Sequence, residues 1–285
     1  MAFCDECGCY DDNHIDGEDI TEEELEKDPL YEPHRYYYWH GDIQEDYQMP
    51  KGYECLCEEC FGDFLGKGEI IEKGGVNIST VGGEFSENMQ NRIPGADKDP
   101  KYQATGISIV IHPKSPLIPS MHFNTRYIKT SSSWFGGGMD VTPSNDYEDE
   151  SKFFHSELKK LCDKHDESYY KKYKEWCDKY FFLPHRNEPR GIGGIFFDYL
   201  DSGKPSDDFK FVKDVGLFFK KYLIDIILKY KDMPWNDNHV KNQLIKRGRY
   251  VEFNLLHDRG TKFGLETGGN IDAILMSMPP LAMWK

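Results

Sequence analysis

Short runs of alternating or β-branched residues, bounded by glycine or proline, recur in this chain and constrain its fold more than any other feature. Each run has the length of a β-strand. They span residues 75–84, 105–113, 121–129, 134–143, 193–200, 249–258 and 270–278. Several connections, such as the one from 129 to 134, are much shorter than the crossover of about a dozen residues that parallel strands require. The strands are therefore expected to pair antiparallel.

Helical periodicity marks three longer segments. Apolar residues recur at helical spacing in residues 149–165, 168–182 and 209–230. Asn236 or Asp237 is a suitable cap for a shorter helix that runs through Lys246. Because helices and strands are interspersed without strict alternation, the chain is predicted to form an α+β domain. Its expected architecture is a large, flat, mainly antiparallel β-sheet flanked on both faces by α-helices.

The acidity of the chain is confined to its first quarter. Residues 1–70 hold 21 Asp or Glu against 4 Lys or Arg, whereas residues 71–285 hold 29 against 31, within a formal net charge of −15. The larger part is therefore nearly neutral and lacks the strong basic patch of a nucleic-acid-binding protein. We expect an acidic, cysteine-rich N-terminal arm at 1–68 and a folded domain at 69–285.

Six of the eight cysteines lie in this arm. They are Cys4, Cys7, Cys9, Cys55, Cys57 and Cys60. A zinc site built from two CxxC pairs and a reduced arm without metal are both open, because the gap between the pairs far exceeds the ~15–20 residues usual in zinc ribbons. The N-terminus lacks the apolar core of a secretory signal, and no apolar run approaches the ~20 residues of a membrane span. A cytoplasmic protein without disulfides is expected.

The run MHFNTRYIK, residues 121–129, places three polar side chains of different chemistry on one face of a strand. His122, Asn124 and Arg126 are spaced two residues apart. Successive side chains on a strand point to opposite sides, so these three share a face. Histidine has an unperturbed pKa of about 6.5 and exchanges protons near neutral pH. His122 is therefore our candidate for proton transfer.

Arginine is scarce in this chain and clustered. There are 8 arginines against 27 lysines. Six arginines lie in the segments richest in glycine, histidine and asparagine: Arg126, Arg186, Arg190, Arg247, Arg249 and Arg259. A guanidinium fork binds a carboxylate or phosphate through two parallel bonds, which an ammonium group cannot do. Either these arginines form an anion site, or they pair with nearby acids such as Glu188, Glu252 and Asp258; both alternatives are open.

Motifs for nucleotides and metals are not supported. The glycines at 191–194 lack GxGxxG spacing, and no Ser or Thr follows the Gly-Lys near Gly66 as a phosphate loop requires. The histidines are scattered, without the HxH or HxxxH spacing of a metal site. The glycine-rich stretch WFGGGMD, residues 134–140, is expected to allow a bulge or the close approach of a flat ligand.

Several long blocks together resemble the oxygen-dependent coproporphyrinogen III oxidases of haem biosynthesis. The blocks are EKGGVNIS, GISIVIHP, MHFNTRYI, WFGGGMDVTP, KYKEWCDKYFFLPHRNEPRGIGGIFFDYL, GRYVEFNLLHDRGTKFGLETGG and ILMSMPPLAMW, in one order from about Glu69 to Trp284. The resemblance implies that 69–285 is a catalytic domain. It would convert two propionates of coproporphyrinogen III to vinyl groups, giving protoporphyrinogen IX, with molecular oxygen as co-substrate and carbon dioxide and hydrogen peroxide as by-products.

The same resemblance carries expectations for fold, cofactors and assembly. It implies a flat antiparallel sheet between layers of helices, and a homodimer with residues 250–285 at the interface. The family uses no flavin, haem or nicotinamide. A requirement for a divalent metal has been debated for it, and no metal ligand is assigned here. Neither nucleic acid nor a membrane is an expected partner.

The resemblance also implies roles for individual residues. His122 resembles the family's proposed proton donor, and Asp258 and Arg259 resemble a pair that faces the centre of the tetrapyrrole, so these three are the expected catalytic residues. The expected substrate-binding residues are Ser108, Asn124, Thr125, Arg126, Gly268, Gly269 and Asn270. Histidines once proposed as metal ligands in the family correspond to His112, His155 and His185.

Two departures from the family pattern define the alternative function. Asn270 stands where many relatives have arginine, and the acidic arm replaces a stretch with Trp-Arg and several glycines. Either change would weaken substrate binding. The alternative is therefore a catalytically impaired homologue that binds a tetrapyrrole without converting it.

Overall fold

The computed structural model describes residues 2–3, 10–11, 70–266 and 271–285. Within the first two ranges, β1 (Ala2–Phe3) and β2 (Tyr10–Asp11) form a short antiparallel pair. The predictions for the six N-terminal cysteines and for the substrate-binding residues at 268–270 lie outside the described residues.

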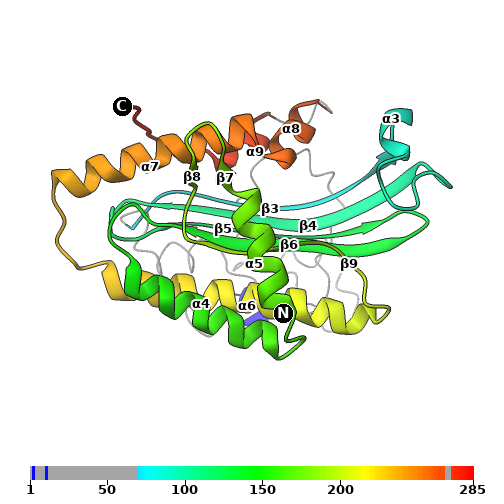
Figure 1. Cartoon of the computed structure of the whole chain (residues 1–285), viewed down its shortest axis with the longest axis horizontal. Coiled ribbons are helices and arrows are strands. Elements are labelled where there is room, and N and C mark those ends of the chain that lie inside the picture. The colour runs from blue at the N-terminus through cyan, green and yellow to red at the C-terminus, as the bar shows by residue number, and fades with distance from the viewer. Residues whose placement is uncertain (1, 4–9, 12–69, 267–270) are drawn as a thin grey trace, which may run out of the picture.

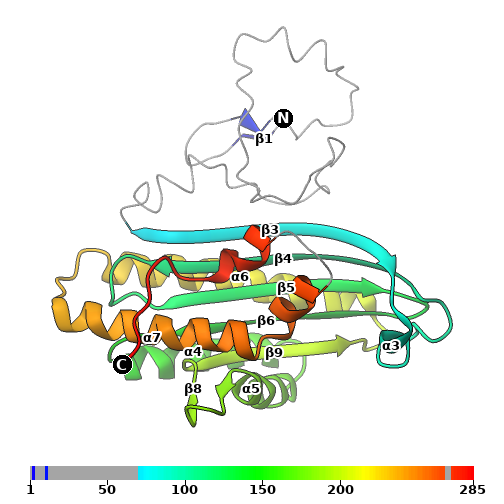
Figure 2. The same cartoon turned by 90° about the horizontal axis from the view of Figure 1, so that it is seen from above.

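Five strands form one antiparallel sheet in the order β3-β4-β5-β6-β9, and Figure 2 shows them side by side from β3 at one edge to β9 at the other. They are β3 (Ile71–Glu84), β4 (Lys101–Pro113), β5 (Ser120–Lys129), β6 (Ser133–Thr142) and β9 (Gly193–Leu200). Every neighbouring pair runs antiparallel, as the short connections predicted. Five of the seven predicted strands are thus confirmed. The short helix α3 (Glu87–Gln90) lies between β3 and β4.

One face of the sheet packs against α4 (Glu148–Asp163) and α6 (Pro205–Tyr230), below the sheet in Figure 1. Proline suits the first turn of α6 because the N–H groups of that turn have no partner within the helix. The ring of Phe123 on β5 stacks on Phe219 of α6 with centroids 5.2 Å apart. α5 (Tyr169–Tyr180) packs along the edge strand β9. This face therefore carries the main hydrophobic core.

The opposite face of the sheet carries the C-terminal helices (Figure 1). They are α7 (Asp237–Leu256), α8 (Arg259–Glu266), α9 (Ile271–Ile274) and the 3-10 turn η1 (Leu275–Ser277), with the hairpin strands β7 (Phe182–Leu183) and β8 (Glu188–Pro189) beside α7. Asn236 caps α7, as predicted, because its side chain accepts hydrogen bonds from two backbone N–H groups of the first turn. A second, smaller hydrophobic cluster lies on this side, around Phe181, Phe196 and Phe253.

Two predicted strands are helical instead. Residues 249–256 belong to α7, which continues ten residues beyond the predicted end at Lys246, and 270–278 contains α9 and η1. Four of the buried residues in this half of α7 recur at helical spacing: Arg247, Tyr250, Phe253 and Asn254. Because two of these four residues are polar, a search for apolar periodicity misses the helix.

The α+β class, with a mainly antiparallel sheet and helices on both faces, is confirmed. The sheet contains fewer strands than expected, because two apolar runs became part of the helical layer. Within 70–266 and 271–285, no helix is both long and apolar enough to cross a membrane.

Candidate functional site

The predicted polar face of MHFNTRYIK lies on the side of the sheet that carries α7 and α8. Directly opposed residues of antiparallel strands share a face, and Ser108 of β4 is opposite Asn124 of β5. Because Phe123 points to α6, its neighbours His122 and Asn124 point the other way, together with Arg126. The structure therefore brings Ser108, His122, Asn124 and Arg126 to one face. Thr125 alternates with them and its side chain points to the α4–α6 side.

His122 is held by partners on both ring nitrogens. Nδ1 lies 2.9 Å from Oδ1 of Asp140 on β6, and Nε2 lies 3.3 Å from the side-chain nitrogen of Asn124. An ionised carboxylate only accepts, so Nδ1 carries a proton and donates it to Asp140, while Nε2 accepts from Asn124. The ring edge of His122 also meets Phe181, at 6.1 Å between centroids. These contacts fix both the tautomer and the orientation of the imidazole.

Asp140 is held from behind by the buried Arg190, one of the six clustered arginines, which the sequence did not connect with His122. Nη2 of Arg190 lies 2.6 Å from Oδ2 of Asp140, and both side chains are only 2 % exposed. The guanidinium is stacked against Phe181 and Tyr250, 4.0 and 4.4 Å from the ring centroids. Burial acts to raise the pKa of Asp140, but attraction to Arg190 and the bond from His122 outweigh it and lower the pKa. Asp140 is thus ionised at neutral pH.

The Asp140–Arg190 pair also connects the sheet to the C-terminal helices. Nη1 of Arg190 donates to Oδ1 of Asn254 on α7 at 3.0 Å, and the amide nitrogen of Asn254 donates to Oγ of Ser277 at 3.2 Å. A continuous polar chain therefore runs from His122 to η1. Its signal in the sequence is weak: Asp140 is a lone charge in an otherwise apolar strand, and counting outward from the turn at 130–132 places it opposite His122.

Asp258 and Arg259 lie at the junction of α7 and α8, where both contact Tyr180. Asp258 accepts hydrogen bonds from the Tyr180 hydroxyl at 2.9 Å and from the backbone N–H of Thr261 at 2.6 Å. The guanidinium of Arg259 lies 5.0 Å from the centroid of the Tyr180 ring. Asp258 is therefore a helix-capping residue as well as a candidate site residue.

Tyr180 joins the two halves of the candidate site. Its ring stacks on Phe196 of β9 with centroids 4.6 Å apart and planes 6° from parallel. The guanidinium of Arg126 lies 5.9 Å from the Phe196 centroid. Arg126 from the sheet and Asp258 from the helical layer thus flank one stacked pair of rings. Neither Tyr180 nor Phe196 was predicted as a site residue, because their role depends on contacts between distant segments.

The remaining predicted histidines lie in three separate environments. His112 is buried between Ser120 and the backbone oxygen of Ser277, and His155 bonds to the backbone oxygen of Ile192. Burial is the main cause that lowers the pKa of His112, to about 3, and it also lowers the pKa of His155. Among the described residues, no three His, Cys, Asp or Glu side chains are grouped so that they could hold a metal ion.

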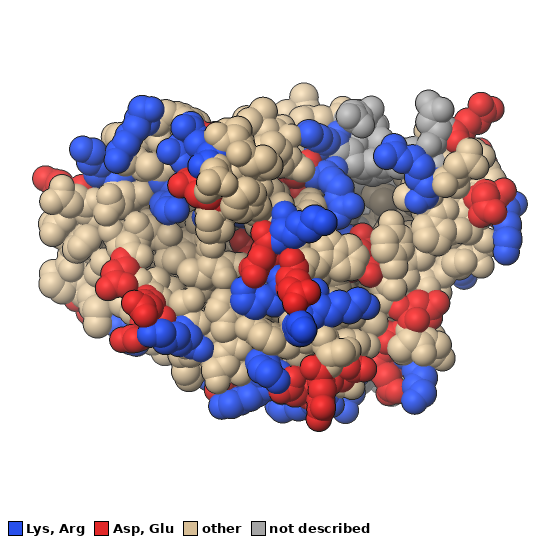
Figure 3. Space-filling view, viewed as in Figure 1, with Lys and Arg blue, Asp and Glu red and all other residues tan. Residues whose placement is uncertain are grey.

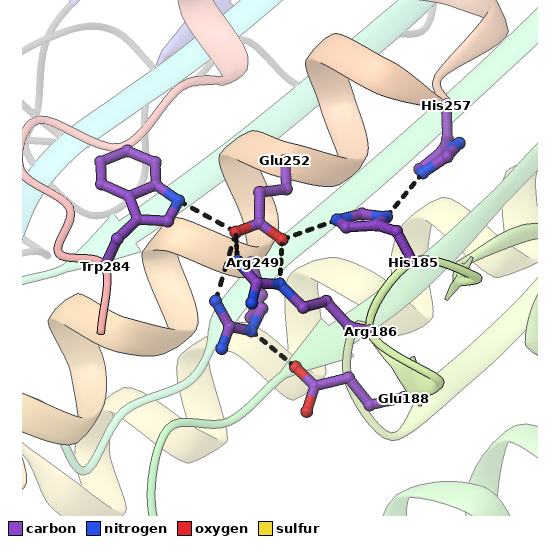
Figure 4. A network of polar contacts seen from close by, with 7 residues as sticks. All are labelled: His185, Arg186, Glu188, Arg249, Glu252, His257 and Trp284. Atoms are coloured by element: carbon purple, nitrogen blue, oxygen red, sulfur yellow. Dashed lines mark hydrogen bonds and ion pairs between the residues drawn. The ribbon is translucent and has the colours of Figure 1, made fainter.

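His185 belongs to a network centred on Glu252, which Figure 4 shows from close by. The side chain of Glu252 accepts hydrogen bonds from His185, Arg186, Arg249 and Trp284. The bonds from Arg186 lower the pKa of Glu252 to about 2, with His185 and Arg249 acting in the same direction. Arg249 also pairs with Glu188, and Arg247 with Glu72. For these three arginines, pairing with an acid is the alternative that the structure bears out.

Two cavities in the described part of the chain are not lined by His122, Asn124 or Arg126. One of about 520 Å³ lies at the far end of β3 and β4 and contains none of the predicted site residues. Another, of about 10 Å³, lies beside Asp140 and Arg190. In Figure 3 the surface is hollowed above the sheet, between α8 and α3. On the side of the molecule that Figure 3 shows, basic and acidic side chains are interspersed and form no continuous basic patch.

Together, the fold and this face define a class: an α+β protein whose antiparallel sheet presents a carboxylate-bound histidine and arginines beside stacked aromatic rings. Such a face suits a flat, anionic ligand with which a proton is exchanged. A family model described as "Coproporphyrinogen III oxidase" matches residues 46–285. The chain belongs to the coproporphyrinogen III oxidase family.

Curated relatives in Rickettsia are similar over most of their length. The chain is 59% identical over 218 residues to the oxygen-dependent coproporphyrinogen-III oxidase of Rickettsia bellii (strain OSU 85-389), which covers 76% of the chain and 78% of the relative. It is 59% identical over 216 residues to the protein of the same name from Rickettsia akari (strain Hartford), with 76% and 77% covered. The protein of that name from Rickettsia rickettsii (strain Sheila Smith) is 58% identical over 216 residues, with the same coverage.

Proposed function

We propose that this chain catalyses the oxygen-dependent oxidative decarboxylation of coproporphyrinogen III to protoporphyrinogen IX. At each of two propionates, the carboxyl group leaves as carbon dioxide, and two hydrogen atoms are transferred to molecular oxygen, leaving a vinyl group and hydrogen peroxide. The observation that carries the proposal is the family match over 46–285, which includes His122, Asp258 and Arg259. The match begins upstream of residue 69, and the boundary of the N-terminal arm stays a prediction.

Proton transfer is the role we propose for His122. Asp140 holds Nδ1 at 2.9 Å, whereas Asn124 lies 3.3 Å from Nε2, so Nε2 is the nitrogen proposed to exchange a proton with the substrate when the substrate replaces the longer contact from Asn124. The carboxylate of Asp140 stabilises the imidazolium form that exists after His122 takes up a proton. Arg190 keeps Asp140 ionised, and it thereby supports His122 without contacting the substrate itself.

Substrate carboxylates and pyrrole N–H groups need complementary partners, and the described residues supply both. Arg126 and Arg259 are the proposed partners of propionates, because a guanidinium fork matches carboxylate geometry. Oδ1 of Asn124 is buried and has no hydrogen-bond partner among the described residues. A buried acceptor without a partner is costly, so a donor from a bound substrate would stabilise it. We propose that a pyrrole N–H of the bound substrate donates a hydrogen bond to Oδ1 of Asn124.

Asp258 is proposed to bind further pyrrole N–H groups and to assist their deprotonation. Its carboxylate already accepts two hydrogen bonds, from Tyr180 and Thr261, and a carboxylate has about four acceptor positions. The remaining positions are available to substrate. Ser108, in register with Asn124, is proposed to contact the substrate from β4. Roles for Thr125, Gly268, Gly269 and Asn270 stay predictions.

A homodimer through the C-terminal segment is proposed as the functional assembly. Several large apolar side chains of this segment are exposed: Leu255, Leu256, Leu265, Ile271, Leu281 and Trp284. A concentration of exposed apolar residues is typical of a protein–protein interface. The cytoplasmic location expected from the sequence stays a prediction.

The decisive experiment is incubation of the purified protein with coproporphyrinogen III, in air and without oxygen, followed by chromatography of the products. We expect protoporphyrinogen IX only in air, with oxygen consumed and carbon dioxide released. His122→Ala is expected to lower kcat by at least about 100-fold, the usual contribution of a general acid or base. His165→Gln, on the α4–α6 side, is the matched control and is expected to keep full turnover.

A spectral shift on binding without any product in air would instead identify a protein that binds tetrapyrroles without converting them. No observation on the described residues favours that alternative. It therefore enters only as an outcome of this test.

A further inference from the structure

Arg126 is held by an acid from a strand that is not its neighbour. Nη2 of Arg126 on β5 lies 2.8 Å from Oδ2 of Asp198 on β9, and β6 runs between these two strands. The position of β6 that lies opposite Arg126 is Gly136. A Cβ atom there would lie 2.6 Å from Oδ1 of Asp198 and 2.9 Å from Nε of Arg126. The missing side chain of Gly136 is what allows the ion pair to cross β6.

A β-bulge on β9 sets the position of Asp198. Phe135 pairs with Leu200 and Gly137 pairs with Phe197, so Gly136 faces two residues, Asp198 and Tyr199. Such bulges locally redirect side chains and are found beside active sites. The bulge also lets Phe197 and Leu200 both reach the main core, although they are three positions apart.

Tyr199 has an unusual backbone conformation within this bulge. Its φ is 56°, in the left-handed region that a bulky residue enters at a cost of about 1–3 kcal/mol. The backbone N–H of Tyr199 donates to Oδ1 of Asp198 at 3.2 Å. The carboxylate of Asp198 is thereby held at both oxygens, by backbone on one side and by Arg126 on the other. A strained backbone that fixes one carboxylate beside a predicted substrate-binding residue indicates a functional constraint.

The ion pair leaves part of the Arg126 fork available. Its side chain is 30 % exposed, whereas that of Asp198 is 13 % exposed. The pair engages Nη2, at one edge of the guanidinium. Because a guanidinium carries five N–H donors in one plane, fixing one edge also fixes the direction of the others.

We propose that Asp198 is a positioning residue: it fixes Arg126 across Gly136 so that the free edge of the guanidinium meets a propionate of the substrate. The proposal rests on the proposed function, because it takes coproporphyrinogen III as the ligand. Two effects oppose each other when Asp198 is removed. Arg126 gains net charge, which at a partly exposed site stabilises a bound carboxylate only slightly. It also loses its fixed direction, and with it the two-pronged geometry on which tight binding of a carboxylate depends. Loss of orientation is therefore expected to dominate.

The test is Asp198→Asn, which keeps the shape of the side chain and an acceptor for the Tyr199 N–H but removes the charge. We expect KM and the anaerobic Kd for coproporphyrinogen III to rise about tenfold, with kcat changed by less than about twofold, as for lost binding that is equal in ground and transition states. Gly136→Ala should reproduce this rise with Asp198 intact. Asp214→Asn, which changes the carboxylate bonded to His165 on the α4–α6 side, is the matched control and should change neither constant.

A double-mutant cycle separates positioning from a general structural effect. In an Arg126→Ala background, Asp198→Asn should cause no further rise in Kd, because its effect passes through Arg126. An unchanged Kd in Asp198→Asn, or equal rises with and without Arg126, would overturn the proposal. If the wild type bound coproporphyrinogen III but formed no product, the proposed reaction would fail while the Kd values still decided the role of Asp198. A wild type that does not bind this ligand would overturn both.

Discussion

At the scale of single residues, Asp140 has two partners whose needs are different. Towards His122 it accepts a hydrogen bond that fixes the imidazole, and towards Arg190 it supplies the countercharge of a guanidinium that is almost fully buried. The second task dominates stability, since a buried charge without its partner is far more costly than a lost hydrogen bond. The first task dominates function.

Replacing Asp140 by asparagine should therefore affect stability and activity together. We expect Asp140→Asn to lower the free energy of unfolding by about 3–5 kcal/mol, because Arg190 is left buried without a countercharge. Turnover should fall as well, since the amide no longer fixes Nδ1–H of His122. His122→Gln is the control: it should reduce turnover while leaving the Asp140–Arg190 pair and most of the stability intact. Urea unfolding of both variants tests this, and an Asp140→Asn protein as stable as wild type would refute it.

The pH range of this effect follows from the pKa of Asp140. The pKa is lower in the folded chain than the value of about 3.9 for a free aspartate. The stabilisation is therefore fully present above about pH 4 and is lost only as the pH falls through the folded pKa. Near neutral pH the pair contributes without variation.

The sequence reveals site residues that lie close together along the chain, but not those that come together only when distant segments pack. His122, Asn124 and Arg126 share a face because a strand repeats every two residues, and this needs no knowledge of the rest of the fold. The partners of His122 and Arg126 are different: Asp140 and Asp198 follow from strand register, and Arg190 from the packing of a distant loop. Residue types alone do not encode those contacts, so they were missed.

At the scale of elements, α7 shows why a short run is ambiguous. Residues 249–256 contain Tyr250, Val251 and Phe253, which suit a strand, yet the segment is helical. As part of α7, the segment helps to bury polar side chains with their partners: Arg247 bonds to the backbone oxygen of Pro113 and to Glu72, and Asn254 bonds to Arg190. The strands at 71–142, in contrast, have clear strand patterns, and β4–β5 and β5–β6 are joined by short connections, so their positions and antiparallel direction were predicted, whereas their order in the sheet was not.

The link between β4 and η1 gives a prediction for the pH dependence of stability. His112 is 0 % exposed, and its Nε2 donates to the backbone oxygen of Ser277 at 2.9 Å while Nδ1 accepts from Ser120. Burial lowers its pKa from 6.5 to about 3. Between these values the unfolded chain binds a proton that the folded chain does not, so stability falls as the pH falls below about 6.5, by about 1.4 kcal/mol per unit.

We therefore expect the free energy of unfolding to drop by about 2 kcal/mol through His112 alone when the pH is lowered from 7 to 5. His155 and His257, whose pKa values burial also lowers, contribute with the same sign. The contribution of His112 is isolated by comparing wild type with His112→Gln, in urea, at both pH values. The variant should lose about 2 kcal/mol less than wild type over this interval. Equal losses in the two proteins would contradict the prediction, because they would show that His112 has the same pKa in the folded and unfolded chains.

At the scale of the whole molecule, the two helical layers differ in their relation to the sheet. α4 and α6 cover a continuous apolar core, whereas the contacts of α7 and η1 with the sheet include the smaller cluster around Phe253 and several polar bonds, among them the polar chain from Asp140 to Ser277. The C-terminal layer also exposes leucines at 255, 256, 265 and 281. A subunit contact on this layer would bury those leucines and would hold the helices that carry Asp258 and Arg259 in place over the sheet.

The proposed dimer is tested by introducing a glutamate into each helical layer separately and measuring the mass of the assembly by sedimentation. Wild type is expected to sediment at about twice its chain mass of 33.2 kDa. Leu256→Glu, at a side chain that is 52 % exposed on α7, should produce monomers, because the dimer would lose about 1.5–3 kcal/mol of apolar burial and would have to bury a carboxylate. Leu217→Glu, 49 % exposed on α6, is the matched control and should remain dimeric.

Activity then shows whether the contact matters for the site. If the dimer holds α8 in place, the Leu256→Glu monomer should have a raised KM for coproporphyrinogen III, because Asp258 and Arg259 lose their fixed position relative to Arg126. Sedimentation and kinetics are measured over the same range of protein concentration. A wild type that is monomeric throughout, or dissociation by Leu217→Glu but not by Leu256→Glu, would exclude the C-terminal layer as the interface.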